Sequence, residues 1–192
     1  MRLLRTIVTA GVTAVIVLMV PAAAAQAAPS DAASCQPSPV SQPFLAWGDS
    51  TYYELVPGGD FAGPPDWSLD GGAALSDAGG TASLALADGA VATSPQACVN
   101  VVHPKVRFFA RTDTPGTTVG VDAVFDDDHG SVSIPIGTVS PTTDWAPTQP
   151  LTFRPAIVPA IDGGSAYVGL SFTANGGTAY ISDVYIDPWR KW

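Results

Sequence analysis

The sequence predicts an all-β domain, because three features favour short strands over helices. Short runs with alternating apolar and polar side chains recur along the chain beyond residue 43. The chain has 19 glycines and 18 prolines, and most of them lie between these runs, where they indicate turns. No amphipathic helical pattern follows the N-terminal segment. Many short strands with frequent turns are typical of a β-sandwich or barrel.

The first 27 residues have the features of a secretory signal peptide. Arg2 and Arg5 supply positive charge, and residues 7–20 form a mostly apolar run that small residues follow. The run is shorter than the roughly 20 residues that span a bilayer, which argues against the alternative of an N-terminal membrane anchor. Residues 25–27 (Ala-Gln-Ala) match a cleavage site. We therefore expect a secreted protein that has no membrane span after cleavage.

Charge and cysteine content narrow the function classes further. The sequence has 8 Lys+Arg against 17 Asp+Glu, a net charge of −9, and loss of Arg2 and Arg5 with the signal peptide makes the mature chain more acidic. This balance excludes a nucleic-acid binder that needs a basic face. Two cysteines and two histidines cannot build a zinc-finger type of site. Cys35 and Cys98 are the only pair available, so export predicts one disulfide between them.

The first part of the mature chain leads into a single domain. Residues 28–43 are rich in Pro, Ser and Ala and predict an extended leader without a core of its own. We expect one domain over residues 44–192. Its first strand-like run is 51–56, and a second at 83–87 ends at Asp88-Gly89.

The later runs predict a bend and two hairpins. Residues 101–102 and 106–111 flank Pro104, which indicates a bend or two abutting strands. A first hairpin is expected where two alternating runs flank a polar turn, and a second where two runs flank Asn175-Gly176-Gly177. The expected hairpin strands are 118–125 and 131–137 for the first, and 166–172 and 179–186 for the second.

Two segments at the ends of the domain resemble a known fold family. Residues 56–63 (Val-Pro-Gly-Gly-Asp-Phe-Ala-Gly), followed by Trp67, and residues 180–188 (Tyr-Ile-Ser-Asp-Val-Tyr-Ile-Asp-Pro) resemble the opening and closing motifs of galactose-binding-like jelly rolls. Many carbohydrate-binding modules have this fold. The resemblance implies a jelly-roll β-sandwich of short antiparallel strands whose first and last strands are neighbours. Further landmarks resemble a family of small exported actinobacterial proteins: Trp67, Cys98, 107–109 and Trp145.

The same resemblance implies a structural calcium site. Polar and acidic residues near the first and last strands of such jelly rolls surround Ca²⁺, which prefers several oxygen ligands. Asp60 lies in the opening motif, and Asp183 matches the second acid of the closing motif. Ala62 and Ser182 stand where the motifs have acids, so two carboxylates are missing. The alternative is a polar edge strand with hydrogen-bonded aspartates. No other cofactor is expected.

A catalytic alternative comes from residues 47–50 (Trp-Gly-Asp-Ser), which resemble the nucleophile block of the GDSL hydrolases. A serine esterase of this type would use Ser50 as nucleophile, His129 as base and Asp126 to orient the imidazole ring. That family has an α/β fold with its histidine near the C-terminus. Here the histidine lies in the predicted hairpin tip, which is solvated. These differences favour a protein without catalytic residues.

Aromatic side chains are the remaining functional feature. Modules that bind sugars stack the apolar faces of the rings on Trp or Tyr. Trp145 lies in a turn-rich segment, and we expect it to contact a ligand. Tyr52 and Tyr53 point to opposite faces of one strand, and we expect Tyr52 to contact a ligand as well. Trp67 is expected to lie in the core. The leading hypothesis is a secreted, monomeric, non-catalytic module that binds extracellular or cell-wall glycans. The alternatives are the serine esterase and a structural or interaction protein of the cell envelope without a small ligand.

Overall fold

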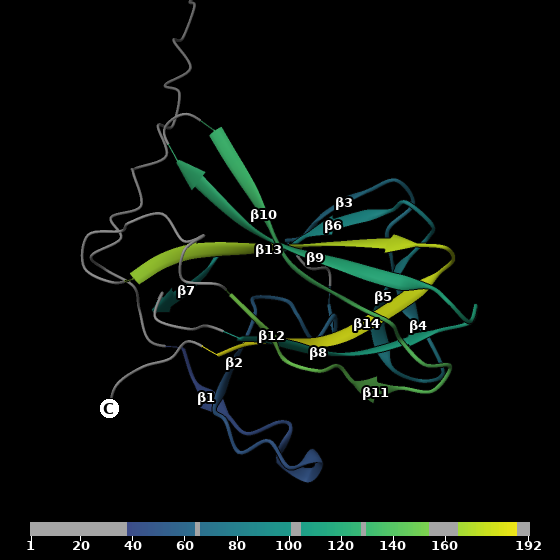
Figure 1. The fold of residues 1–192 in the computed structure, drawn as a ribbon, viewed down its shortest axis with the longest axis horizontal. Coiled ribbons are helices and arrows are strands. Elements are labelled where there is room, and N and C mark those ends of the chain that lie inside the picture. Colours follow the sequence, from purple (N-terminus) through teal and green to yellow (C-terminus); the bar gives the residue numbers. More distant parts are fainter. Residues whose placement is uncertain (1–37, 64–65, 101–104, 128–129, 154–164, 188–192) are drawn as a thin grey trace, which may run out of the picture. The chain divides into compact units, whose positions relative to one another are not determined.

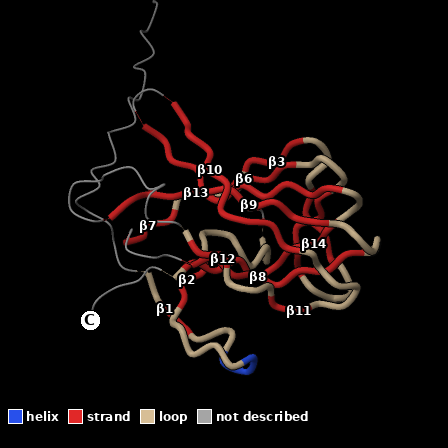
Figure 2. Tube along the Cα trace, viewed as in Figure 1, coloured by secondary structure: helices blue, strands red, loops and turns tan. Residues whose placement is uncertain are grey.

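Strands dominate the part of the chain that the computed structural model describes, residues 38–63, 66–100, 105–127, 130–153 and 165–187 (Figures 1 and 2). The predicted signal peptide, Cys35 and His129 lie outside these residues. The helical content of the described part is η2, a single 3-10 turn at Leu45–Trp47. No helix in these ranges is long and apolar enough to cross a membrane.

The first sheet has eight strands arranged around β14 (Ala179–Ile186). One edge of β14 pairs with β8 (Lys105–Thr112), and the other edge pairs with β5 and then with β2. Strands β11 and β12 pair with the far edge of β8. The remaining strands of this sheet are β1 (Val40–Ser41), β2 (Tyr53–Leu55), β4 (Ala74–Asp77), β5 (Ala82–Leu86), β11 (Ala146–Pro147) and β12 (Leu151–Thr152).

The second sheet has six strands, with β13 (Ser165–Asn175) at its centre. One edge of β13 pairs with β9, which in turn pairs with β10. The other edge pairs with β7 and β6, and β6 pairs with β3. These strands are β3 (Ser68–Asp70), β6 (Val91–Thr93), β7 (Ala97–Asn100), β9 (Thr118–Asp127) and β10 (Gly130–Val139).

The core lies between the two sheets, because alternate residues of each strand point inward. Phe108 of β8 meets Phe172 of β13 edge to face, with ring centroids 5.2 Å apart. Trp67 stacks on Phe172 at 5.7 Å and is buried, which confirms its predicted core position. Two antiparallel sheets packed over one apolar core confirm the predicted jelly-roll β-sandwich.

The expected hairpins have different outcomes. The first is confirmed, because β9 and β10 pair directly from Asp127↔Gly130 to Val119↔Val139, with one bulge near Pro135. The second is wrong: β13 belongs to the second sheet and β14 to the first. The turn between them carries the chain across the sandwich, and its Gly176 N–H donates to Asp88 Oδ1 at 2.8 Å.

The chain joins the first sheet before the expected start of the domain. Val40 pairs with Glu54, so β1 lies within residues 28–43, for which the composition predicts a leader without a core. Cys98 lies half-buried in β7. Its predicted partner lies outside the described residues, so the disulfide stays a prediction.

Candidate functional site

The outer face of β8 carries all basic side chains of the described residues, namely Lys105, Arg107 and Arg111. Because side chains alternate along a strand, these three share one face with Phe109, while the residues between them belong to the core. A chain with 17 acidic residues therefore places its described positive charge in one row.

The segment that contains η2 packs against this row through aromatic rings. Phe44 is fully buried, and its ring centroid lies 5.1 Å from that of Tyr53 and 5.5 Å from that of Phe109. The Arg107 guanidinium carbon lies 4.4 Å from the Phe44 centroid, within cation–π range. Trp47 contacts Phe109 edge to face at 5.3 Å and yet is 53% exposed. The packing thus fixes Trp47 with much of its surface open to solvent.

Gly48 ends η2 and starts the turn to Asp49. Its φ of 78° lies in the left-handed region that glycine adopts without strain, and its N–H donates to Leu45 O at 3.0 Å. The turn then brings the Asp49 carboxylate back toward β8.

Asp49 links η2, β2 and β8 through hydrogen bonds. Its Oδ2 accepts from Arg107 Nη1 at 2.7 Å and from Tyr53 Oη at 2.8 Å, while Oδ1 accepts from the Thr51 N–H at 3.0 Å. Arg107 Nε donates to Thr148 O at 2.7 Å. This network holds the η2 segment, β8 and the β11–β12 connection together.

The network also sets two pKa values. Burial raises the pKa of Asp49, but hydrogen bonds from Thr51, Tyr53 and Arg107 outweigh burial and lower this pKa to about 2. Burial and the hydrogen bond to Asp49 raise the pKa of Tyr53 well above its usual range. Asp49 is therefore ionised and Tyr53 protonated at neutral pH.

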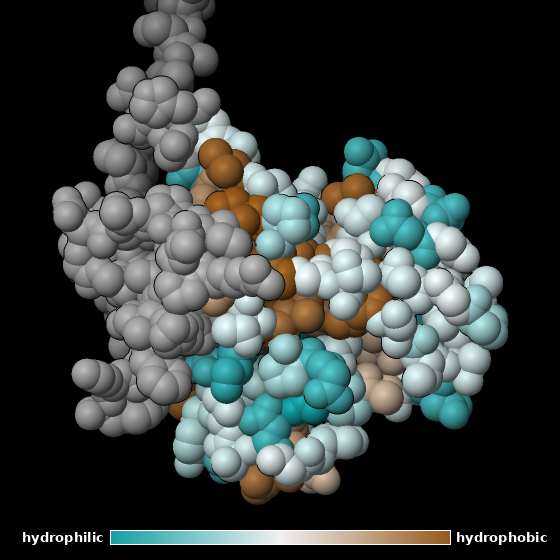
Figure 3. Space-filling view, viewed as in Figure 1, coloured by the Kyte–Doolittle hydropathy of each residue, from teal (hydrophilic) through white to brown (hydrophobic). Residues whose placement is uncertain are grey.

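A hollow of about 370 Å³, which we call the Trp47 hollow, lies between η2, β8 and the β11–β12 connection. Lys105 is half-buried there and forms no ion pair within the described residues. The view in Figure 3 shows hydrophilic atoms below an apolar centre, over the region where η2, β8 and the β11–β12 connection meet. The hollow is lined by Trp47, Gly48, Asp49, Ser50, Lys105, Arg107, Gln149 and Pro150.

A second hollow of about 310 Å³ has Gln149 in its lining, as the first does. It lies where the end of β10 faces β8, β11 and β12. Hydroxyl groups and proline rings supply much of its lining, which consists of Ala110, Thr138, Val139, Ser140, Pro141, Thr142, Ala146, Pro147, Thr148, Gln149 and Leu151.

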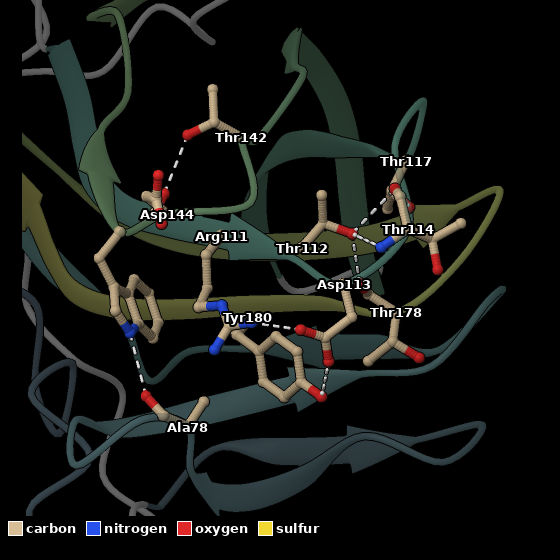
Figure 4. Close-up of polar contacts among 11 residues, drawn as sticks. Ala78, Arg111, Thr112, Asp113, Thr114, Thr117, Thr142, Asp144, Thr178 and Tyr180 are labelled. Atoms are coloured by element: carbon tan, nitrogen blue, oxygen red, sulfur yellow. Dashed lines mark hydrogen bonds and ion pairs between the residues drawn. The ribbon is translucent and has the colours of Figure 1, made fainter.

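The far end of β8 carries another set of polar contacts (Figure 4). Arg111 forms an ion pair with Asp113, and Tyr180 Oη donates to the other Asp113 oxygen at 2.8 Å. That hydrogen bond, with burial, raises the pKa of Tyr180. Trp145 is half-buried, and its indole N–H donates to Ala78 O at 3.0 Å. The bond anchors one edge of the Trp145 ring, which we expected to contact a ligand.

The structure separates most residues that the sequence proposed for a site. Tyr52 is 52% exposed and Tyr53 is fully buried, as their alternation predicts, but Tyr52 is not among the residues that line the Trp47 hollow. Ser50 is exposed in that hollow. Asp126 lies in the second sheet, where its carboxylate accepts from Gln96 Nε2 at 2.6 Å and from Ser131.

The opening and closing motifs do lie side by side. Val184 N–H donates to Gly59 O at 3.0 Å, and Val56 N–H donates to Val184 O at 2.9 Å. Burial raises the pKa of Asp183, and the negative charge of nearby Asp60 raises it further. Asp60 and Asp183 could supply only part of the ligand set of a cation. No cluster of three or more acidic, histidine or cysteine side chains that could hold a metal occurs among the described residues.

Comparisons with known proteins show the fold. No family model and no curated protein matches the sequence. A Clostridium thermocellum xylanase 10B structure with CBM22-1 and GH10 modules, complexed with xylohexaose, matches with a TM-score of 0.50 and 16% identity. The match covers 71% of this chain, which spans 28% of that one. A CBM4 structure matches with a TM-score of 0.47 and 21% identity, over 69% of this chain and 99% of that one.

The xylanase structure includes a carbohydrate-binding module, and the match to it confirms at the level of the fold the resemblance seen in the end motifs. The sequence did not nominate Trp47 as an exposed ring, nor Lys105 and Gln149 as lining residues. A usable signal was present, because Arg107 and Arg111 share one face of the predicted strand 106–111 in a cation-poor chain, and Lys105 comes directly before that strand.

Proposed function

We propose that this chain is an exported, non-catalytic carbohydrate-binding module whose ligand lies in the Trp47 hollow. The observation that carries the proposal is the 53% exposed Trp47 ring, packed against Phe109 beside a hollow of about 370 Å³ with polar lining. A ring held in place by packing loses little side-chain freedom when a sugar stacks on it. The fold supports the proposal, since the xylanase structure that it resembles contains a carbohydrate-binding module and was solved with xylohexaose.

The polar lining complements the ring. A sugar presents hydroxyl groups around an apolar face, and the hollow offers Gln149, Ser50 and Lys105 as hydrogen-bonding side chains.

The carboxyl groups that line the Trp47 hollow support binding without catalysis. Hydrolysis of a glycosidic bond needs two carboxyl groups on either side of it. Among the described residues, Asp49 supplies the one carboxylate that lines the Trp47 hollow, and this group is bound by Arg107 and Tyr53. We infer that the lining holds a glycan and leaves it intact.

Pull-down on insoluble xylan and cellulose, together with a glycan array, tests the proposal on the purified exported protein. We expect at least one polysaccharide to bind and Trp47→Ala to weaken that binding about tenfold or more. Leu75→Ala is the matched control, because Leu75 is a 45% exposed apolar residue of β4 that does not line either hollow. Unchanged binding in Trp47→Ala would show that the ligand lies elsewhere, and no binding to any glycan would overturn the proposal.

A further inference from the structure

The three basic side chains of β8 differ in whether an ion pair neutralises them. Asp49 neutralises Arg107 and Asp113 neutralises Arg111, each through an ion pair. Lys105 lines the Trp47 hollow and has no such partner within the described residues. Within the described part of the chain, the hollow therefore carries one positive charge without an ion-pair partner, beside an exposed indole ring.

We propose that the Trp47 hollow selects an anionic glycan, with a sugar ring stacked on Trp47 and a carboxylate or sulfate group of the sugar bound by Lys105. This inference rests on the proposed function and names its ligand class. A charge-assisted hydrogen bond from an ammonium group is roughly twice as strong as a neutral one, so such a contact discriminates an acidic sugar from its neutral counterpart.

The positive charge of Lys105 contrasts with the negative net charge of the protein. The chain has a net charge of −9, so its long-range field repels acidic polymers. A neutral sugar can accept a hydrogen bond from Lys105, but only an anionic sugar also gains the attraction between opposite charges. Asp49 does not cancel Lys105, because its two oxygens are engaged by Arg107, Tyr53 and Thr51.

Titration calorimetry on matched polymer pairs tests the inference. Polygalacturonate and glucuronoxylan supply carboxylates, and each is compared with its carboxyl-reduced form. Dextran sulfate is compared with dextran and distinguishes sulfate from carboxylate recognition. The protein variants are Lys105→Gln, Trp47→Ala and Ser68→Asp. Ser68→Asp is the charge control, because it lowers the net charge by the same amount on an exposed residue of β3 in the other sheet.

We expect the charged member of at least one pair to bind more tightly than the neutral one. Lys105→Gln should weaken binding of that charged polymer about tenfold while leaving the neutral one unchanged. Ser68→Asp should bind like the wild type, and 0.5 M NaCl should reduce the preference, because salt screens exposed charges. Trp47→Ala should weaken both members of the pair.

Three results overturn the inference. If the wild type binds neutral and charged polymers equally, or if Lys105→Gln keeps the preference, the charge has no role, and the proposed function stands as long as Trp47→Ala still weakens binding. If no polymer of any kind binds, both the inference and the proposed function fail.

Discussion

Arg107 and Asp49 form an ion pair with Nη1 2.7 Å from Oδ2, although 58 positions separate them in the sequence. Their side chains are only 7% and 17% exposed. The pair joins β8 to the turn that follows η2, and the same turn places Trp47 beside the hollow. The ion pair is thus both a structural contact and the support of the candidate site.

Asp49→Asn should lower the free energy of unfolding by about 2–3 kcal/mol at pH 7, because the buried Arg107 charge loses its partner. Urea unfolding measures this difference. Asp77→Asn is the control, since Asp77 is an exposed residue of β4, and its effect should stay within about 0.5 kcal/mol. Equal losses in the two variants would contradict a special role for the pair.

The same pair predicts the pH dependence of stability. The pKa of Asp49 is lowered from 3.8 to about 2 in the folded protein. A carboxyl group with a lowered folded pKa stabilises the protein above its unfolded pKa and loses that contribution as pH falls through the folded value. The difference in unfolding free energy between wild type and Asp49→Asn should therefore be constant from pH 7 to 5 and shrink between about pH 4 and 2. A difference that persists undiminished at pH 2 would contradict the assigned pKa.

Gly59 should resist substitution because the backbone of the closing strand passes close to it. A Cβ at this position would lie 2.9 Å from both Val184 O and Val56 O. Gly59→Ala should destabilise the protein by about 1–3 kcal/mol, measured by urea unfolding, since backbone atoms must move to admit the methyl group. Gly63→Ala is the matched control in the same motif, with no atom within 4 Å of its Cβ. A neutral Gly59→Ala would show that the two motifs pack more loosely than they appear.

Ser50 should be unreactive toward a fluorophosphonate probe. A nucleophilic serine needs a base within hydrogen-bonding reach, and no histidine is among the described residues that line the Trp47 hollow. Asp49, its neighbour in the sequence, is bound to Arg107 and Tyr53 instead of orienting a catalytic ring. Mass spectrometry of the treated protein checks this. Labelling that Ser50→Ala abolishes would support the esterase alternative.

Local patterns in the sequence predicted the fold well and the candidate site poorly. Alternation predicted the long strands β8, β9, β13 and β14, and the end motifs predicted that β2 and β14 are neighbours. Alternation cannot say which sheet a strand joins, so the apparent hairpin around Gly176 was assigned to one sheet although its strands lie in two. The site depends on contacts between distant positions, such as Trp47 with Phe109, which no local pattern encodes.

Asp60 and Asp183 predict how the protein responds to calcium. Burial and the charge of Asp60 raise the pKa of Asp183, so the ionised pair destabilises the fold at neutral pH in the absence of a cation. Asp60→Asn in EDTA should therefore raise the melting temperature. We propose that Ca²⁺ binds this pair and takes its remaining oxygen ligands from backbone carbonyls and water. Millimolar Ca²⁺ should then raise the wild-type melting temperature by about 2–5 °C, as expected for a ligand that binds only the folded state.

Asp183→Asn separates calcium binding from simple charge repulsion. Asp183 has a φ of 49°, a left-handed conformation that asparagine also tolerates, so the variant keeps the backbone while removing one carboxylate. It should melt at the same temperature in Ca²⁺ and in EDTA, whereas Asp70→Asn, an exposed control in β3, should keep the full response of the wild type. If Ca²⁺ leaves the wild-type melting temperature unchanged while Asp60→Asn still raises it, the two acids repel each other without a metal, and this edge of the sheet is held by hydrogen bonds alone.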